Sequence, residues 1–407
     1  MGVTTQLASC CLFVLACVYG CGVGGFQGSD NPPSQGSTPN ALLKRVNGVA
    51  SKGIIRGGTV SLHTLNSNGS VGALLKTTRT NAFGLYSTRV NLTGPTLVSV
   101  SGVYTDEATG LESAIPQDAP LRAAIDTISD TMAIAITPLT ELAVRKSEPM
   151  LVANNIAAAN KLVSDIFRVN IVTTQPLSPT AESFGNELTT QEQKDYTLVL
   201  AAVSQMAHDY YGESVSDAIA SMQNDLTKGD TLGDATSGQF KAALAKFLQS
   251  DLNRTGIRDV NATNLANAGG GTKVITLATS GTLQQGDLIF GVTVTIAMPP
   301  GVTVRISDFV HHQVDSRAVY ASGVIPSSDE NRVRTIGRFV PASASEPAYL
   351  TVSLPLATSG SGLGEFLTIV CDLPVGAAYT ASDFSLPFVK VVNGDGAELQ
   401  DVTVKIN

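Results

Sequence analysis

NAGGGT, residues 267 to 272, separates two kinds of sequence in this chain. Three consecutive glycines add no side chains to a core and interrupt regular secondary structure. Before this stretch apolar residues recur at helical spacing, and after it they alternate with polar residues. We therefore place a domain boundary here, with a helical domain over 126–266 and an all-β domain over 272–407.

The all-β character of 272–407 follows from a period of two. Val292, Val294 and Ile296 alternate with Thr293 and Thr295, and the same pattern recurs over 350–356 and 402–406. Several such segments separated by turn residues predict a β-sandwich, of the jelly-roll kind.

The helical domain is predicted from one stripe and one start signal. The stripe consists of apolar residues spaced three and four apart: Tyr196, Val199, Val203, Met206 and Tyr210. Thr137 before Pro138 is typical of a helix N-cap followed by its first residue, and Glu141 suits the positive end of the helix dipole. We expect these helices to form a small bundle whose stripes make its core.

Residues 43–125 read as short strands joined by turns. Segments 59–63 and 97–101 alternate, and Asn68-Gly69, Gly84 and Gly94-Pro95 are turn signals. The predicted fold class is therefore multidomain and mainly β, with two β-sandwiches separated by a small helical bundle.

The first 42 residues differ from the rest. Residues 12–19 are apolar but too few to span a bilayer, and 22–42 are rich in Gly, Ser, Pro and Asn. Val18-Tyr19-Gly20-Cys21 resembles the bacterial lipobox, which implies a signal peptide over 1–21, lipid attachment at Cys21 and a flexible tether over 22–42. Cys10 and Cys17 also end lipobox-like sequences, and an ordinary cleaved signal or a single N-terminal anchor stays open. No Lys or Arg precedes Lys44, so the positive region of a signal peptide is missing, and a start upstream of Met1 or a misassigned Met1 stays open as well. Each alternative predicts export, to the bacterial outer membrane or cell surface.

Two stretches of the first half resemble known families. TNAFGLY, residues 80–86, is similar to the T-D-x-x-G-x-Y/F signature of carboxypeptidase-regulatory-like, prealbumin-type β-sandwiches, with Asn81 in place of Asp. YTDEATG, residues 104–110, followed by TPLTELA, residues 137–143, resembles an arrangement found in exported bacterial lipoproteins. There a prealbumin-like sandwich leads into a helical segment.

The C-terminal domain resembles cohesin-like and carbohydrate-binding-module-like sandwiches. The stretches that carry the likeness are GDLIFGVTVTIAMPPGVTV (286–304), GEFLTIVCDL (364–373) and DFSLPFVKVVNGDGAEL (383–399). The resemblance leaves open whether this domain binds dockerin, a glycan or nothing.

Charge and cysteine placement argue against a nucleic-acid-binding protein and against a disulfide-rich domain. A net charge of −8 without a basic stripe argues against a nucleic-acid partner. Cys371 is the one cysteine after residue 21, so an internal disulfide framework is excluded, and its place on an apolar strand face predicts a buried, inert thiol.

The residues able to carry chemistry form no recognised catalytic motif. G-x-S-x-G, H-E-x-x-H and the P-loop are absent from the sequence, and Gly360–Gly364 leads into a strand pattern, whereas a phosphate loop precedes a helix. The sequence has four histidines: His63, His208, His311 and His312. The adjacent pair His311 and His312 would point to opposite faces of a strand and has no third ligand nearby, and His208, close to Glu213, is expected on a solvated helix face. Asn393–Glu398 could be a calcium loop, but a hairpin turn explains it directly. We expect Asp106 and Glu107, near Tyr104, to be solvated in a turn.

We therefore expect no catalytic, cofactor or metal residues and a protein that is not an enzyme. The predicted function is that of a cell-envelope lipoprotein for adhesion, glycan contact or scaffolding of a surface assembly, with the membrane and a glycan or surface protein as partners. A carbohydrate-binding-module protein of polysaccharide metabolism is the first alternative. The absence of Trp weakens it, although a row of exposed tyrosines among Tyr104, Tyr320, Tyr349 and Tyr379 could replace the missing platform. An envelope hydrolase with two carboxylates is the second.

Overall fold

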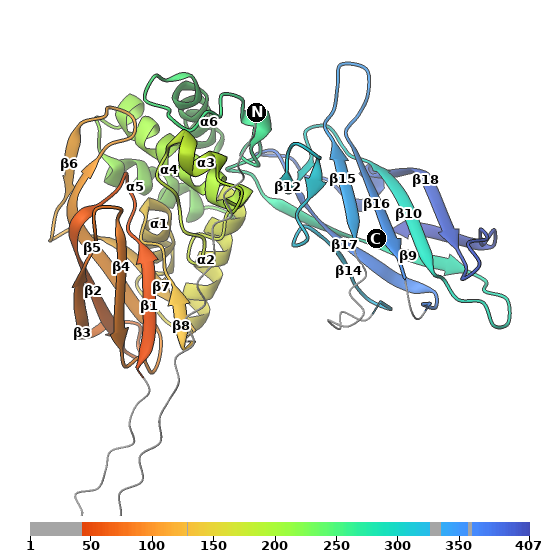
Figure 1. Cartoon of the computed structure of the whole chain (residues 1–407), viewed down its shortest axis with the longest axis horizontal. Helices are drawn as coiled ribbons and strands as arrows, with labels where there is room; N and C mark the ends of the chain where they lie inside the picture. Colours follow the sequence, from red (N-terminus) through yellow and green to blue (C-terminus); the bar gives the residue numbers. More distant parts are fainter. Residues whose placement is uncertain (1–42, 128, 326–334, 357–359) are drawn as a thin grey trace, which may run out of the picture. The chain divides into compact units, whose positions relative to one another are not determined.

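The computed structural model describes residues 43–127, 129–325, 335–356 and 360–407. Over these residues the protein is mainly β, with 35% strand against 24% helix, several sheets and six α-helices (Figure 1). The predicted mainly β class is confirmed. Cys21, the signal peptide and the tether lie outside the described residues.

The first β segment forms two sheets. One has the order β3-β2-β5-β6, with β7 also paired to β5, and the other has the order β4-β1-β8. Their strands are β1 (Lys44–Val49), β2 (Arg56–Leu65), β3 (Val71–Arg79), β4 (Leu85–Val90), β5 (Thr96–Thr105), β6 (Glu112–Ile115), β7 (Leu121–Ile125) and β8 (Thr131–Ala133). β8 follows residue 125 and pairs in parallel with β1. Val46 and Val60, one from each sheet, belong to one fully buried cluster.

The turn at TNAFGLY has the predicted local structure. The side-chain oxygen of Asn81 accepts hydrogen bonds from the backbone N–H of Phe83 (2.9 Å) and Leu85 (3.0 Å). Gly84 has φ +73°, a left-handed conformation that glycine adopts without strain. Tyr86 then enters the core, where its hydroxyl donates to the Ile134 carbonyl at 2.8 Å.

Six helices follow, and they form the second core. They are α1 (Pro138–Ser147), α2 (Ala153–Phe167), α3 (Ala181–Gly185), α4 (Gln191–Tyr210), α5 (Val215–Leu226) and α6 (Asp234–Gln249). Thr137 is the N-cap of α1, as predicted, and its hydroxyl also bonds that of Tyr196 at 2.7 Å. The predicted apolar stripe lies on α4 and is buried from Tyr196 to Met206. Its last member, Tyr210, lies in the final turn of the helix and is 46% exposed. Val144 of α1 and Ala124 of β7 share a further cluster, so the helices pack on the first β segment.

Two further sheets make up the C-terminal segment. One has the order β12-β13-β15-β16-β10-β18, and the other β11-β17-β9-β19 with β14 paired to β17. The strands are β9 (Thr272–Gly281), β10 (Gly291–Ala297), β11 (Thr303–Val304), β12 (Ile306–Asp308), β13 (Gln313–Val314), β14 (Val319–Ala321), β15 (Ile336–Val340), β16 (Tyr349–Pro355), β17 (Gly364–Asp372), β18 (Ser385–Val392) and β19 (Val402–Ile406). Val294 of β10 and Cys371 of β17 belong to one buried cluster that includes side chains of both sheets. Burial raises the pKa of Cys371, in line with the predicted inert thiol.

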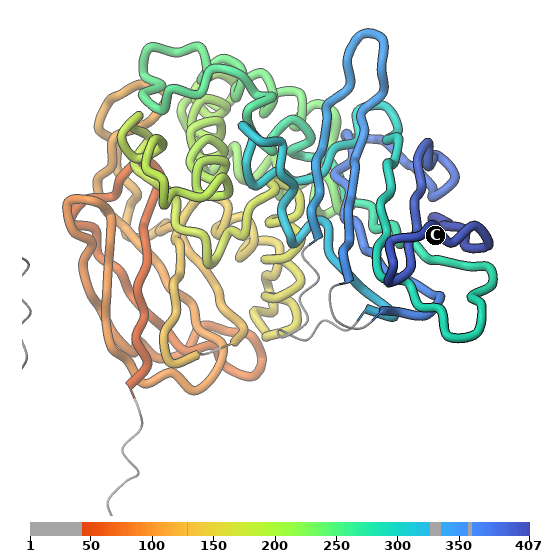
Figure 2. The backbone as a smooth tube through the Cα atoms, turned by 45° about the vertical axis from the view of Figure 1, so that its right-hand side comes forward, coloured from red at the N-terminus to blue at the C-terminus, as the bar shows by residue number. Residues whose placement is uncertain are grey.

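The NAGGGT stretch joins the helices to these strands, and Figure 2 traces the chain through it. The segment is tightly held. Nη2 of Arg168 donates to the carbonyl oxygens of Asn267 (2.8 Å), Gly270 (3.2 Å) and Gly271 (3.0 Å). A Cβ on Gly270 would lie 2.1 Å from the Leu373 carbonyl, so glycine is required by close approach. Residues 42–407 accordingly form one compact unit.

Among the helices of the described part of the chain, none is both long and apolar enough to cross a bilayer.

Candidate functional site

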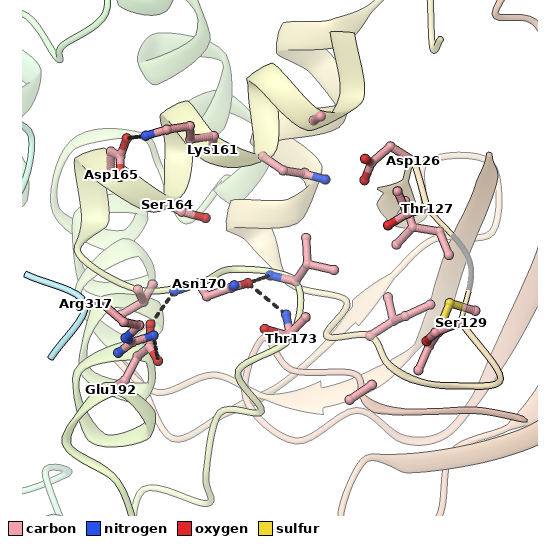
Figure 3. A pocket seen from close by; sticks show the side chains of 18 of the residues that line it. Asp126, Thr127, Ser129, Lys161, Ser164, Asp165, Asn170, Thr173, Glu192 and Arg317 are labelled. Carbon is pink, nitrogen blue, oxygen red and sulfur yellow. Dashed lines mark hydrogen bonds and ion pairs between the residues drawn. The ribbon is translucent and has the colours of Figure 1, made fainter. Parts of the chain in front are cut away.

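A cleft of about 690 Å³ is the candidate site, and most of its lining is shown in Figure 3. Its volume lies within the range of small-molecule sites. The walls come from the end of β7, from α2 and the loop after it, from the first turn of α4, and from Arg305 and Arg317 of the C-terminal segment. Its floor includes apolar side chains such as Met132, Ile134 and Val172.

The polar wall is held in place by backbone hydrogen bonds. Asn170 accepts from the N–H groups of Val172 (3.2 Å) and Thr173 (3.0 Å) through its side-chain oxygen. Asn160 donates to the Ala124 carbonyl at 2.9 Å, and Ser164 accepts from the Ile171 N–H at 3.2 Å. These side chains are therefore preorganised before any ligand arrives.

In Figure 3, Asn170 and Thr173 lie between Glu192 and Arg317 at the left and Asp126 and Ser129 at the right. Asp126 lines the cleft and has no hydrogen-bond partner among the described residues. Its carboxylate is therefore available as an acceptor for a ligand.

Arg317 lies at one end of the cleft and forms ion pairs with two carboxylates. Its Nη1 lies 2.8 Å from Glu192 Oε2 and its Nη2 lies 2.6 Å from Asp315 Oδ2. Burial opposes ionisation of Asp315, but hydrogen bonds from Arg317 hold the pKa of this carboxyl below its usual value. The hydrogen-bonding capacity of Arg317 is therefore largely used within the protein.

A second ionic group lies at the C-terminal end of α2 and extends into the protein behind the cleft. Lys161 pairs with Asp165, and Nη2 of Arg305 lies 3.5 Å from Asp165 Oδ1. Behind them are Arg168 and Asp372, which are 2% and 1% exposed. Arg168 Nε lies 3.2 Å from Asp372 Oδ1, and Arg305 Nε lies 3.7 Å from Asp372 Oδ2.

The second group is not fully satisfied by hydrogen bonds. Nε of Arg168, Nε of Arg305 and Oδ1 of Asp372 are buried and have no hydrogen-bond partner among the described residues. The charges are close, but their geometry does not complete the bonds. Burial raises the pKa of Asp372, and the guanidinium groups of Arg168 and Arg305 oppose that rise.

The prediction that Asp106 and Glu107 are solvated was wrong. Their side chains are 15% and 7% exposed, and both pair with Lys52, at 2.6 and 3.3 Å. The Lys52 ammonium also lies 2.6 Å from the Ser204 hydroxyl of α4 and 4.8 Å from the centre of the Tyr104 ring. A charged partner distant in sequence made burial of both carboxylates possible.

The other residues singled out from the sequence lie outside this cleft. His311 pairs with Asp308 at 2.6 Å, and His208 lies 3.6 Å from Glu213. The structure brings no three His, Cys, Asp or Glu side chains together as a metal site within its described ranges. The side-chain oxygen of Asn393 accepts from the N–H groups of Asp395 (3.1 Å) and Ala397 (3.0 Å), and one antiparallel bridge pairs Val392 with Glu398, so this stretch is a turn. The strands on either side of it, β18 and β19, belong to different sheets.

The tyrosines do not form one row. Tyr104 is buried, with Lys52 over its ring. Tyr320 is on β14 and Tyr349 is on β16, in different sheets, and Tyr379 donates its hydroxyl to the Pro300 carbonyl. An aromatic sugar platform of the expected kind is therefore not assembled from these four residues.

Sequence reasoning missed the residues that line the cleft. Lys161, Asp165 and Asn170 belong to an otherwise ordinary amphipathic helix and its following loop, and Arg305 follows a strand pattern. Only for Arg168, behind the cleft, did the local sequence offer a hint of burial. It lies between the apolar residues Ile166-Phe167 and Val169 at the end of a helix.

Comparisons with known proteins give no family. No protein-family model matches the chain, and no curated protein matches it. A solved structure that matches is a 9R-lipoxygenase from Cyanothece PCC8801, with 8% sequence identity and a TM-score of 0.18. The match covers 83% of this chain and 44% of the lipoxygenase chain, so this chain spans less than half of that enzyme.

The prediction that the chain is not an enzyme is corrected. The matching structure is that of an enzyme, and although a TM-score of 0.18 establishes no activity, it leaves the exclusion of catalysis without support. We therefore class the chain neither as an enzyme nor as a non-enzyme. The same match has no bearing on the lipoprotein leader or on the carbohydrate-binding-module-like segment.

Proposed function

We propose that this protein is an exported cell-envelope protein, held at the membrane by a lipid on Cys21, that binds a glycan in the cleft beside α2. In this proposal the segment 43–125 and the segment 272–407 are each β-sandwiches, separated by the helical bundle. The tether over 22–42 would hold them clear of the lipid headgroups.

The observation that supports glycan binding is the chemistry of the cleft. Six charged residues line it, with equal numbers of each sign: Lys161, Arg305, Arg317, Asp126, Asp165 and Glu192. Fixed amide and hydroxyl groups lie between them, over a partly apolar floor. A sugar presents hydroxyls at its edge and C–H groups on its face, so it matches both parts of such a lining.

Binding to a glycan array tests this function. The full chain is expected to bind a subset of glycans, and Asp126→Asn should weaken that binding about tenfold by removing a carboxylate that accepts hydroxyl hydrogen bonds. Asp395→Asn, in an exposed turn outside the cleft, is the matched control and should bind as the parent does. Binding to no glycan, or equal binding by both variants, would contradict the proposal.

The anchor is tested separately. Mass spectrometry of the mature N-terminus should find a diacylglyceryl group on Cys21, and globomycin should block processing. An unmodified N-terminus would remove the lipid anchor and leave the cleft proposal to the array.

A further inference from the structure

The ionic group at the C-terminal end of α2 holds more positive than negative charge. It contains three cations, Lys161, Arg168 and Arg305, and two carboxylates, Asp165 and Asp372. Arg168 and Asp372 are almost completely buried, whereas Lys161 and Arg305 line the cleft. Asp165 also lines the cleft, so the members of this group that face it are two cations and one carboxylate.

A second charged group adjoins Arg305. The Asp315 N–H donates to the Arg305 carbonyl at 2.8 Å, and Arg317 is held there by the carboxylates of Glu192 and Asp315, each at 2.8 Å or closer. Asp126, an acceptor without a hydrogen-bond partner among the described residues, lies on the other side of the cleft in Figure 3, beyond Asn170 and Thr173. That side favours hydroxyl donors and disfavours a negatively charged ligand group.

Arg305 has donors left over. Its ionic contacts are long, at 3.5 Å to Asp165 and 3.7 Å to Asp372, and its Nη1 donates no hydrogen bond to a described residue. Nη1 is also not among the buried atoms that lack a partner, so ligand or solvent can reach it. The Lys161 side chain, on α2, is 76% exposed, so its ammonium can reach a ligand in the cleft.

We infer that the glycan bound in this cleft is acidic, and that Lys161 and Arg305 bind the carboxylate of a uronic acid residue; the inference rests on the proposed glycan-binding function. A planar carboxylate matches the planar guanidinium fork of Arg305, whose Nη1 makes no hydrogen bond to a described residue. The sugar hydroxyls would then lie toward Asn170 and Asp126.

Isothermal titration of the full chain with two matched ligands tests the inference. Oligogalacturonate carries the carboxylates, and its carboxyl-reduced form is the same oligomer with neutral hydroxymethyl groups. The acidic oligomer should bind at least about tenfold more tightly, and the difference should shrink as salt is raised because the ion pairs are partly exposed.

Two variants test whether Lys161 and Arg305 bind the carboxylate of the ligand. Lys161→Gln and Arg305→Gln should each weaken binding of oligogalacturonate about tenfold and leave binding of the reduced oligomer unchanged. Lys390→Gln, exposed on β18 and outside the cleft lining, is the control and should change neither. Because Lys161 is 76% exposed, its variant should remain folded even if loss of Arg305 disturbs Asp372.

The outcomes separate the two proposals. Equal binding of the acidic and reduced oligomers, or an array in which the bound glycans are all neutral, would overturn the acidic class and leave glycan binding in place. An array with no bound glycan would instead overturn the proposed function, and this inference with it.

Discussion

The buried charge network around Lys52 and the one around Arg168 and Arg305 are completed to different degrees. Around Lys52 every charged group is satisfied: the ammonium has Asp106, Glu107 and Ser204 as acceptors. Asp106 also accepts from the Ala108 and Thr109 N–H groups, and Glu107 accepts from that of Gly53. Around Arg168 and Arg305, by contrast, three buried polar atoms make no hydrogen bond to any residue that the structure describes.

This difference distinguishes a structural role from a binding role. A buried charge is tolerated when its hydrogen bonds are complete, as they are around Lys52, where the first β segment meets α4. The network around Arg305 opens onto the cleft and keeps unused donors there. We therefore expect changes around Lys52 to affect mainly stability, and changes at Arg305 to affect mainly binding.

The largest effect is expected from Lys52→Met. The change leaves two largely buried carboxylates without their cation, and breaking a buried pair in this way costs about 3–5 kcal/mol of unfolding free energy. Urea unfolding followed by circular dichroism measures it. A loss below about 1 kcal/mol would show that the network does not stabilise the fold.

Asp195 provides the next test, because its buried carboxyl has only neutral hydrogen-bond partners. It accepts from Gln191 at 2.8 Å and from Asn264 at 2.7 Å, and Asn264 also binds the backbone of Ile306 in β12. Burial raises the pKa of Asp195 to about 7, although these hydrogen bonds oppose the rise.

The sign of the resulting pH dependence follows from proton binding. Between the usual carboxyl pKa and about 7 the folded protein holds a proton that the unfolded chain has lost, so stability falls as pH rises through this window. The total should be a few kcal/mol, since a tenfold change in proton affinity corresponds to about 1.4 kcal/mol. Asp195→Asn should flatten the curve of unfolding free energy between pH 4 and pH 7. An unchanged slope would mean that another group causes the pH dependence.

Arg305→Gln should have a smaller effect on stability, about 1 kcal/mol or less. Its ionic contacts at 3.5 and 3.7 Å are long, and the buried Asp372 keeps Arg168, at 3.2 Å, as a charged partner when Arg305 is lost. Thermal unfolding of this variant beside Lys52→Met measures the contrast between the two networks directly. Equal destabilisation by both changes would remove the distinction on which the binding role of Arg305 depends.

The smallest effect is expected from Lys44→Met, which breaks an exposed pair with Asp130 at the edge of the first β segment. The Asp130 side chain is 88% exposed and the pair is screened by solvent, so the unfolding free energy should not change measurably. The same urea titration gives the baseline against which the effect of losing Lys52 is judged.

The local patterns of the sequence predicted much of the fold. Thr137 is the cap, Asn81 and Gly84 make the turn, and Val292 and Val294 are buried, because each depends on neighbours within a few residues. The cleft could not be predicted in this way. Arg305 and Asp165 are 140 positions apart, and only the folded chain brings them to one wall.

The same reason explains the error at Asp106 and Glu107. Two adjacent carboxylates in a turn are usually solvated, and nothing near them in the sequence identifies Lys52, 54 positions earlier, as their partner. Long-range pairing of charges depends on tertiary contacts that hydrophobic periodicity does not encode.

Hydrogen exchange of the full chain, with and without the glycan that binds best on the array, tests the ligand site most directly. Binding in the cleft should slow amide exchange together in 160–173 and in 303–317, because both segments line the same cavity. Protection confined to turns elsewhere, such as 393–398, with none in these two segments, would contradict binding at this site.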